Sequence, residues 1–132
     1  MTGGRASPRT DLRFAIIGAG MAGILSAIRL AEAGFDDVVL YEKADRIGGT
    51  WRENTYPGIA CDVPSHFYSY SFALNPEWSR RYAPGAEIRE YFENVARRYG
   101  VDARIRFGKE IVRCERVDGR WRLRASDGSD DE

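Results

Sequence analysis

The sequence predicts an α/β fold in which neighbouring strands of the sheet run parallel. An apolar, β-branched run over Leu12–Ile17 stops at a glycine, as a buried parallel strand does. Apolar residues then recur at helical spacing over Met21–Ala33, and a second short apolar run covers Val38–Tyr41. Strand, glycine turn, helix and strand within about 30 residues form a βαβ unit, whose two strands must be parallel.

The middle of the chain predicts a long connection followed by a helix. Asp45–Pro84 is rich in glycine, proline and aromatic residues and shows no long periodicity. Loops of this length are usually functional or disordered, and the many aromatic residues argue against disorder. Over Ala86–Tyr99 one apolar stripe recurs at helical spacing, and Gly100 is placed to close that helix.

The last third predicts strands of a different kind. Ala103–Phe107 is a short apolar strand candidate. Glu110–Val117 and Arg120–Ala125 flank Asp118-Gly119, which is a strong two-residue hairpin signal. Asp127-Gly128 would start another turn, after which the sequence ends in acidic residues at Glu132.

Composition narrows the function classes. The 132 residues suit one domain, and 20 basic residues balance 20 acidic ones, so we expect neither nucleic acid nor a membrane as partner. No apolar run approaches the roughly 20 residues of a membrane span.

Residues 1–11 are polar and are expected to form a flexible leader rather than a secretory signal. Cys61 and Cys114 match no metal or redox spacing, which predicts reduced thiols, a cytoplasmic protein and no metal site.

A glycine motif joins the first strand to the first helix. Residues 18–23 read GAGMAG, which is the GxGxxG pattern placed between a strand and a helix. In such a turn Gly18 permits the tight bend, Gly20 lets the backbone approach a pyrophosphate, and Gly23 allows close helix–strand packing. Unpaired N–H groups and the helix dipole would then hold the phosphates.

Two later features extend this nucleotide signature. Glu42 lies 19 residues beyond Gly23, where an acidic side chain accepts hydrogen bonds from ribose hydroxyls and repels a 2′-phosphate. Residues 46–51 read RIGGTW, and the adjacent glycines allow the backbone to pass close to a flat or anionic group. A flavin dinucleotide uses such a second turn, whereas an NAD domain does not need it. Taken alone, the glycine pair is equally consistent with a simple loop.

Further short motifs follow in the same order and spacing as in a known family. The combination GxGxxG, E, GGTW, YPG, CDVPS and YSYSF resembles the N-terminal FAD segment of the class B flavin monooxygenases, and within them the Baeyer–Villiger monooxygenases. The resemblance runs from about Phe14 to Gly128. It implies a Rossmann-like FAD-binding domain, with a parallel sheet, helices and a β-meander, over residues 12–132 and incomplete at its C-terminus.

The resemblance also implies a set of cofactor-binding residues, drawn from both glycine turns, the end of the second strand and three later positions: Gly18, Gly20, Met21, Ala22, Gly23, Glu42, Lys43, Gly49, Thr50, Trp51, Asp62, Tyr68 and Val112. Asp62 matches the family's active-site aspartate, which lies near the flavin and the nicotinamide and tunes a catalytic arginine. Tyr68 would line the flavin pocket, and the backbone of Val112 would meet the adenine.

The activity that the resemblance implies needs more than this chain. In such enzymes NADPH reduces FAD, and O2 then supplies an oxygen atom that is inserted beside a ketone carbonyl or added to a sulfide. The family's histidine fingerprint, second GxGxxG and catalytic arginine have no counterpart here, and the only histidine is His66. We therefore expect a truncated chain or fragment, inactive alone, whose NADPH site lies outside it.

Two other functions remain open from the sequence. The chain is also consistent with a stand-alone module or pseudoenzyme that binds FAD or ADP without turnover. It is consistent as well with the NAD-binding Rossmann domain of another oxidoreductase, although the second glycine turn favours FAD. Asp62 has its own alternative, as a capping or turn residue shortly before Pro64.

Overall fold

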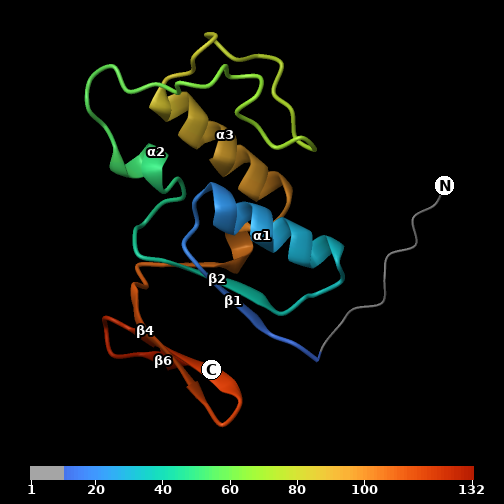
Figure 1. The fold of residues 1–132 in the computed structure, drawn as a ribbon, viewed down its shortest axis with the longest axis vertical. Helices are drawn as coiled ribbons and strands as arrows, with labels where there is room; N and C mark the ends of the chain where they lie inside the picture. Colours follow the sequence, from blue (N-terminus) through green and yellow to red (C-terminus); the bar gives the residue numbers. More distant parts are fainter. Residues whose placement is uncertain (1–10) are drawn as a thin grey trace, which may run out of the picture.

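The computed structural model describes residues 11–132 and contains two three-stranded sheets. The parallel sheet has the order β1 (Phe14–Ile17), β2 (Val38–Glu42) and β3 (Ile105–Phe107). In Figure 1, α1 (Met21–Glu32) and α3 (Gly85–Arg98) lie on one side of this sheet, and the antiparallel sheet lies on the other. The predicted α/β class, with a parallel sheet, helices and a β-meander, is confirmed.

The apolar periodicity of the sequence forms the core between the parallel sheet and the two long helices. Ile24 and Ile28 of α1 are 0% and 2% exposed and belong to the same buried cluster as Leu40 of β2. Phe14 and Ile16 of β1 pack against that cluster, whereas the alternate β1 residues face outward. This alternation arises because successive strand side chains point to opposite faces.

The long connection from β2 to α3 is ordered and contains one short helix, α2 (Thr50–Glu53), which the sequence pattern did not reveal. Its aromatic residues anchor it to the helices. The Tyr91 hydroxyl of α3 accepts a hydrogen bond from the Tyr70 backbone N–H at 2.9 Å and donates one to the Ala73 carbonyl at 2.7 Å. The Tyr70 hydroxyl donates to the carbonyl oxygen of Met21 at the start of α1. Aromatic packing thus replaces regular structure in this segment.

The antiparallel sheet comprises β4 (Ile111–Val117), β5 (Arg120–Ala125) and β6 (Asp130–Asp131). The predicted Asp118-Gly119 turn has φ of 51° and 85° at its two residues, as a type I′ hairpin turn requires. Asp131 joins this sheet to the parallel one, since Arg13 donates to its carboxylate at 2.8 and 2.9 Å and the Tyr41 hydroxyl also donates to it.

Some predicted boundaries move by a few residues. The first strand begins at Phe14 rather than at residue 12, because its ladder starts where Phe14 pairs with Val38 at the beginning of β2. The expected strand over residues 103–107 opens with a 3₁₀ helix, η1 (Asp102–Arg104), and pairs with β2 only from Ile105 onward. Of the predicted leader over residues 1–11, all but Asp11 lies outside the described residues.

Candidate functional site

A pocket of about 350 Å³ lies between the two glycine turns. Most of the residues predicted to bind the cofactor line it, namely Gly18, Gly20, Met21, Ala22, Gly23, Gly49, Thr50, Trp51 and Tyr68, together with Ile17 and Gly48. These residues come from the end of β1, the glycine turn after it, the first turn of α1, the loop before α2, the start of α2 and the long connection. Such convergence of separated segments on one cavity is typical of a ligand site.

The first glycine turn is built for close backbone approach. Gly18 has φ of 100°, which favours glycine, and a Cβ on Gly23 would lie 2.0 Å from the Gly18 carbonyl oxygen. Gly20 is the N-cap residue of α1 and has no side chain that could bond the first N–H groups of the helix. Within residues 11–132, no protein acceptor is found for the backbone N–H groups of residues 20–23. The turn therefore offers free donors, at the positive end of an α-helix, to an anion in the pocket.

The second glycine turn packs against the first. The Gly48 N–H donates to the Ala19 carbonyl at 3.2 Å, and a Cβ on Gly20 would lie 3.6 Å from the Cα of Gly49. Gly48 and Gly49 have φ of 137° and 52°, so both positions favour glycine. In the described part of the chain, the N–H groups of Gly49 and Thr50 have no protein acceptor. The two turns thus present unpaired backbone donors to one cavity.

Two aromatic side chains form the wall of the pocket beyond the second turn. The Trp51 Nε1–H donates to the Tyr68 hydroxyl at 3.1 Å, and the two rings meet edge to face with centroids 5.7 Å apart. Tyr68 packs in turn against Phe92 of α3. The pocket therefore changes from polar backbone donors at the glycine turns to an apolar aromatic wall, which suits a ligand with an anionic centre and a flat end.

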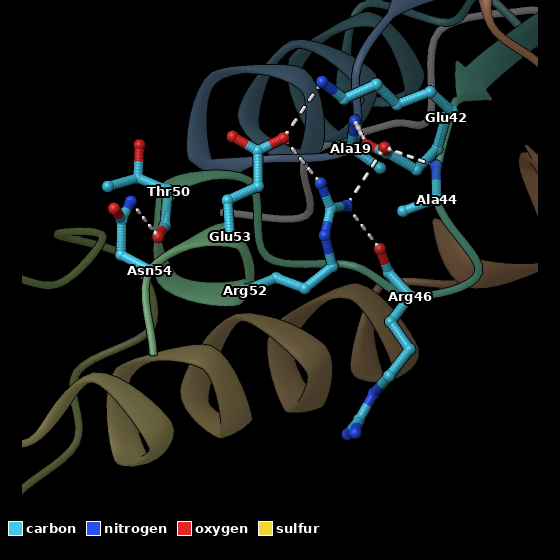
Figure 2. Close-up of polar contacts among 9 residues, drawn as sticks. Ala19, Glu42, Ala44, Arg46, Thr50, Arg52, Glu53 and Asn54 are labelled. Atoms are coloured by element: carbon cyan, nitrogen blue, oxygen red, sulfur yellow. Dashed lines mark hydrogen bonds and ion pairs between the residues drawn. The ribbon is translucent and has the colours of Figure 1, made fainter. Parts of the chain in front are cut away.

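Glu42 lies at the end of β2, behind the first glycine turn, and is only 3% exposed. Its carboxylate accepts hydrogen bonds from the backbone N–H groups of Ala19 at 2.8 Å and Ala44 at 3.0 Å, and from Arg52 Nη1 at 3.0 Å (Figure 2). Burial raises the pKa of the Glu42 carboxyl, but the two N–H groups and Arg52 outweigh it, so the pKa lies below its ordinary value.

Four predicted site residues do not line the pocket. Besides the buried Glu42, Lys43 points to Glu53 of α2, with 3.1 Å between Nζ and Oε1. Asp62 is exposed, and its carboxylate has no hydrogen-bond partner among the described residues, so the alternative capping contact is not seen. Val112 lies on β4 in the other sheet and is 59% exposed.

The sequence motifs did not single out two residues that organise the site. Arg52 pairs with Glu42 and is described below. Ser65 is 1% exposed, and its hydroxyl accepts from the Ala83 N–H at 2.9 Å while contacting the carbonyl oxygens of Arg80 and Arg81 at 2.8 and 2.9 Å. It thereby fixes the CDVPS segment to the approach to α3. A serine in a loop has no spacing signal that would reveal this role.

Comparison with known families matches residues 16–83 to the NAD(P)-binding Rossmann-like domain family. This range spans both glycine turns and the Glu42 position. The chain belongs to this family. The Rossmann-like domain has no helix in residues 11–132 that is long and apolar enough to cross a membrane, and no cluster there of three or more histidine, cysteine or acidic side chains placed to hold a metal ion.

The Rossmann-like domain is homologous to part of several larger monooxygenases. It is 53% identical over 116 residues to an uncharacterized monooxygenase of Mycobacterium tuberculosis, covering 88% of this chain and 23% of the relative. It is 45% identical over 120 residues to a Baeyer–Villiger monooxygenase of Streptomyces coelicolor, again covering 23% of that protein. The chain thus spans about a quarter of the length of these relatives.

Solved structures agree with the sequence relatives. A cyclohexanone monooxygenase of Rhodococcus sp. Phi1 bound to NADP⁺ superposes with a TM-score of 0.82 at 34% identity, over 89% of this chain and 23% of that one. A steroid monooxygenase bound to NADP superposes with a TM-score of 0.81 at 36% identity. The predicted resemblance, to the FAD segment of Baeyer–Villiger and related flavin monooxygenases, is confirmed.

Proposed function

We propose that this chain binds the ADP half of FAD in the pocket between its two glycine turns. The supporting observation is that the same cavity is lined by residues of both turns whose backbone N–H groups have no acceptor in residues 11–132. A pyrophosphate carries two negative charges and needs several donors at close range, which glycines without side chains allow. The residues present therefore fit an anionic dinucleotide.

The second glycine turn favours FAD over NAD as the ligand. The ADP portion of either dinucleotide needs only the first turn and an acidic residue after β2. Here the second turn adds the free N–H groups of Gly49 and Thr50, followed by the Trp51–Tyr68 aromatic wall. A flavin ring extends past the pyrophosphate, and we propose that this aromatic wall receives it.

The remaining predicted residues take their roles by homology. Glu42 and Lys43 would lie at the adenosine ribose, and the Val112 backbone at the adenine. Asp62 would act as a catalytic residue beside the flavin and the nicotinamide. Its exposed carboxylate, with no partner in residues 11–132, is free to contact a group from outside this chain.

We infer that the chain serves an NADPH- and O2-dependent flavin monooxygenase that acts on ketones or sulfides. The bound flavin would supply the redox and oxygen chemistry, and this chain would supply binding and orientation. We place the NADPH site and the second half of the FAD domain outside residues 12–132, and we expect no turnover from these residues alone. Two unpaired cysteines, Cys61 and Cys114, fit a cytoplasmic location.

Gly20→Ala tests the site without disturbing the fold. Gly20 has φ of −88°, and a Cβ there would make an ordinary 3.6 Å contact with Gly49, so the apoprotein should keep its melting temperature. The added methyl group would lie between the two turns, and we expect the affinity for FAD to fall at least about tenfold. Fluorescence titration of FAD, on the protein at its natural length, measures the effect.

Ser26→Ala on the same helix is the matched control, since its exposed hydroxyl bonds only the Ala22 carbonyl. It should bind FAD as the wild type does. A wild-type protein that binds ADP or NAD but no FAD would contradict the proposal. So would a Gly20→Ala protein with unchanged FAD affinity.

A further inference from the structure

Arg52 joins the two halves of the proposed FAD site. Its side chain lies on α2, directly after the second glycine turn, and is only 13% exposed. Nη1 donates to Glu42 Oε1 at 3.0 Å and to the Arg46 carbonyl oxygen at 2.9 Å, and Nη2 donates to Glu53 Oε1 at 2.9 Å (Figure 2). One guanidinium therefore connects the loop after β2, the helix α2 and the carboxylate at the end of β2.

The Glu42 carboxylate continues this connection to the other glycine turn. Its Oε2 accepts from the backbone N–H of Ala19, which lies between the first two glycines of the GxGxxG motif. The path from Arg52 through Glu42 to Ala19 thus runs behind the pocket, from the helix that follows the second glycine turn to the first glycine turn. Since Arg52 and Glu42 are both largely buried, this pair constrains the spacing of the two turns.

The acceptor capacity of Glu42 is nearly filled in this arrangement. An ionised carboxylate offers about four lone-pair positions. The N–H groups of Ala19 and Ala44 and the Arg52 guanidinium occupy three of them. One position remains, which is enough for a single ribose hydroxyl. The orientation of that position depends on the groups that hold the other three.

The Arg52–Glu42 pair also reduces electrostatic repulsion at the site. A pyrophosphate at the first glycine turn would bring two negative charges close to the Glu42 carboxylate, which bonds that same turn. Like charges in a partly buried site repel strongly. The Arg52 guanidinium balances the carboxylate locally, so that the ribose contact and the pyrophosphate contact become compatible.

We propose that Arg52 is a positioning residue of the FAD site, which orients and charge-balances Glu42 so that its carboxylate accepts from one ribose hydroxyl beside the bound pyrophosphate. This inference rests on the proposed function. It assigns to Arg52 no contact with the reacting atoms. Arg52 affects FAD binding through Glu42, and this dependence on Glu42 distinguishes a positioning residue from a purely structural one.

The test compares Arg52→Met, Arg52→Lys, Glu42→Gln and the double variant Glu42→Gln/Arg52→Met, in the protein at its natural length. FAD dissociation is measured by fluorescence titration at about pH 8 and about pH 5.5, because a buried Glu42 without its cation protonates more readily. Arg97→Met is the matched control, since Arg97 lies exposed on α3 and donates only to Asn94 there.

We expect Arg52→Met to weaken FAD binding about a hundredfold near pH 8, where the unbalanced Glu42 carboxylate repels the pyrophosphate, and about tenfold near pH 5.5, where protonation of Glu42 removes that repulsion, whereas wild type changes little. In the Glu42→Gln background the same substitution should change affinity less than about threefold. Arg52→Lys, which keeps the charge but loses the planar fork, should be intermediate and nearly independent of pH. It also carries the test if Arg52→Met does not fold.

Two results would overturn the inference. One is a loss of FAD affinity in Arg52→Met that is equal at both pH values and equally large in the Glu42→Gln background, which would show that Arg52 has a structural role alone. Wild-type FAD binding with no effect of either Arg52 substitution would refute the inference and leave the proposed function intact. A wild-type protein that binds no FAD would refute the proposed function, and the inference with it.

Discussion

At the scale of single residues, Glu42 shows how burial and pairing are balanced. A carboxylate that is 3% exposed is unfavourable unless donors surround it, and here two backbone N–H groups and Arg52 do so. Because they hold the pKa below its ordinary value, the charged form stabilises the fold. That stabilisation is present above the unfolded pKa of about 4.5 and is lost as the pH falls through the lower folded value.

Glu42→Gln should therefore destabilise the apoprotein most at neutral pH. It leaves Arg52 without its buried partner, and we expect a loss of about 1.5–3 kcal/mol in the free energy of unfolding near pH 7. The difference from wild type should shrink as the pH falls below about 4.5 and through the lower folded pKa, at which the wild-type carboxyl also becomes neutral. Urea unfolding at several pH values measures both. A constant difference across this range would contradict the stated pairing of Glu42.

At the scale of elements, the crossing of α1 over β1 sets the shape of the first glycine turn. Gly23 lies in the first turn of α1, and a Cβ there would lie 2.0 Å from the Gly18 carbonyl oxygen and 3.5 Å from Ile16. Real Cβ atoms do not approach a carbonyl oxygen so closely, so either the helix or the strand end would have to move. Gly20, by contrast, has room for a methyl group.

Gly23→Ala and Gly20→Ala should consequently differ in their effect on the stability of the apoprotein. Gly23→Ala should lower the free energy of unfolding by roughly 1–3 kcal/mol or more in the absence of any ligand, through overpacking of helix against strand. Gly20→Ala should leave that free energy nearly unchanged. Urea denaturation of the two apoproteins, with Ser26→Ala as the control on α1, distinguishes them. Equal midpoints for Gly23→Ala and wild type would show that the crossing is looser than described.

At the scale of the whole molecule, Asp131 couples the two sheets. Arg13, beside the first residue of β1, and Tyr41 of β2 both donate to the Asp131 carboxylate. Arg13 Nε also lies 3.6 Å from Asp37 Oδ1. Burial and the neighbouring Asp131 raise the pKa of Tyr41 to about 12. A raised folded pKa gives stability that is complete below the ordinary value of 10.0 and is lost as the pH rises through about 12.

Asp131→Ala should loosen the antiparallel sheet without unfolding the parallel one. Backbone amides of β4 and β5 should exchange with solvent roughly tenfold faster, while those of α1 and α3 keep their protection. Wild type should show the same selective loss between about pH 10 and 12, and Tyr41→Phe should abolish this pH dependence. Glu32→Ala, which removes an exposed pair with Arg29, is the control. Uniform exchange across both sheets would contradict this coupling.

Most of the fold followed from local patterns that carry their own physical reason. Helical spacing over residues 21–33, the strand before Gly18 and the Asp118-Gly119 turn each predicted an element within a few residues of its observed bounds. The boundaries that moved were those that a partner strand decides, as at Phe14 and Ile105. The short helix α2 was not predicted, because a segment of four residues has too few positions for periodicity.

The sequence by itself determined that two glycine turns, an acidic residue and an aromatic-rich loop belong to one nucleotide site, because each motif carries its spacing within the chain. Only the tertiary structure decided how these parts meet. It brought Gly20 against Gly49, set Trp51 against Tyr68, and placed Arg52 on the Glu42 carboxylate behind the pocket. Contacts between residues distant in sequence depend on how elements pack, and an arginine after a glycine pair carries no local sign of the carboxylate that it will meet.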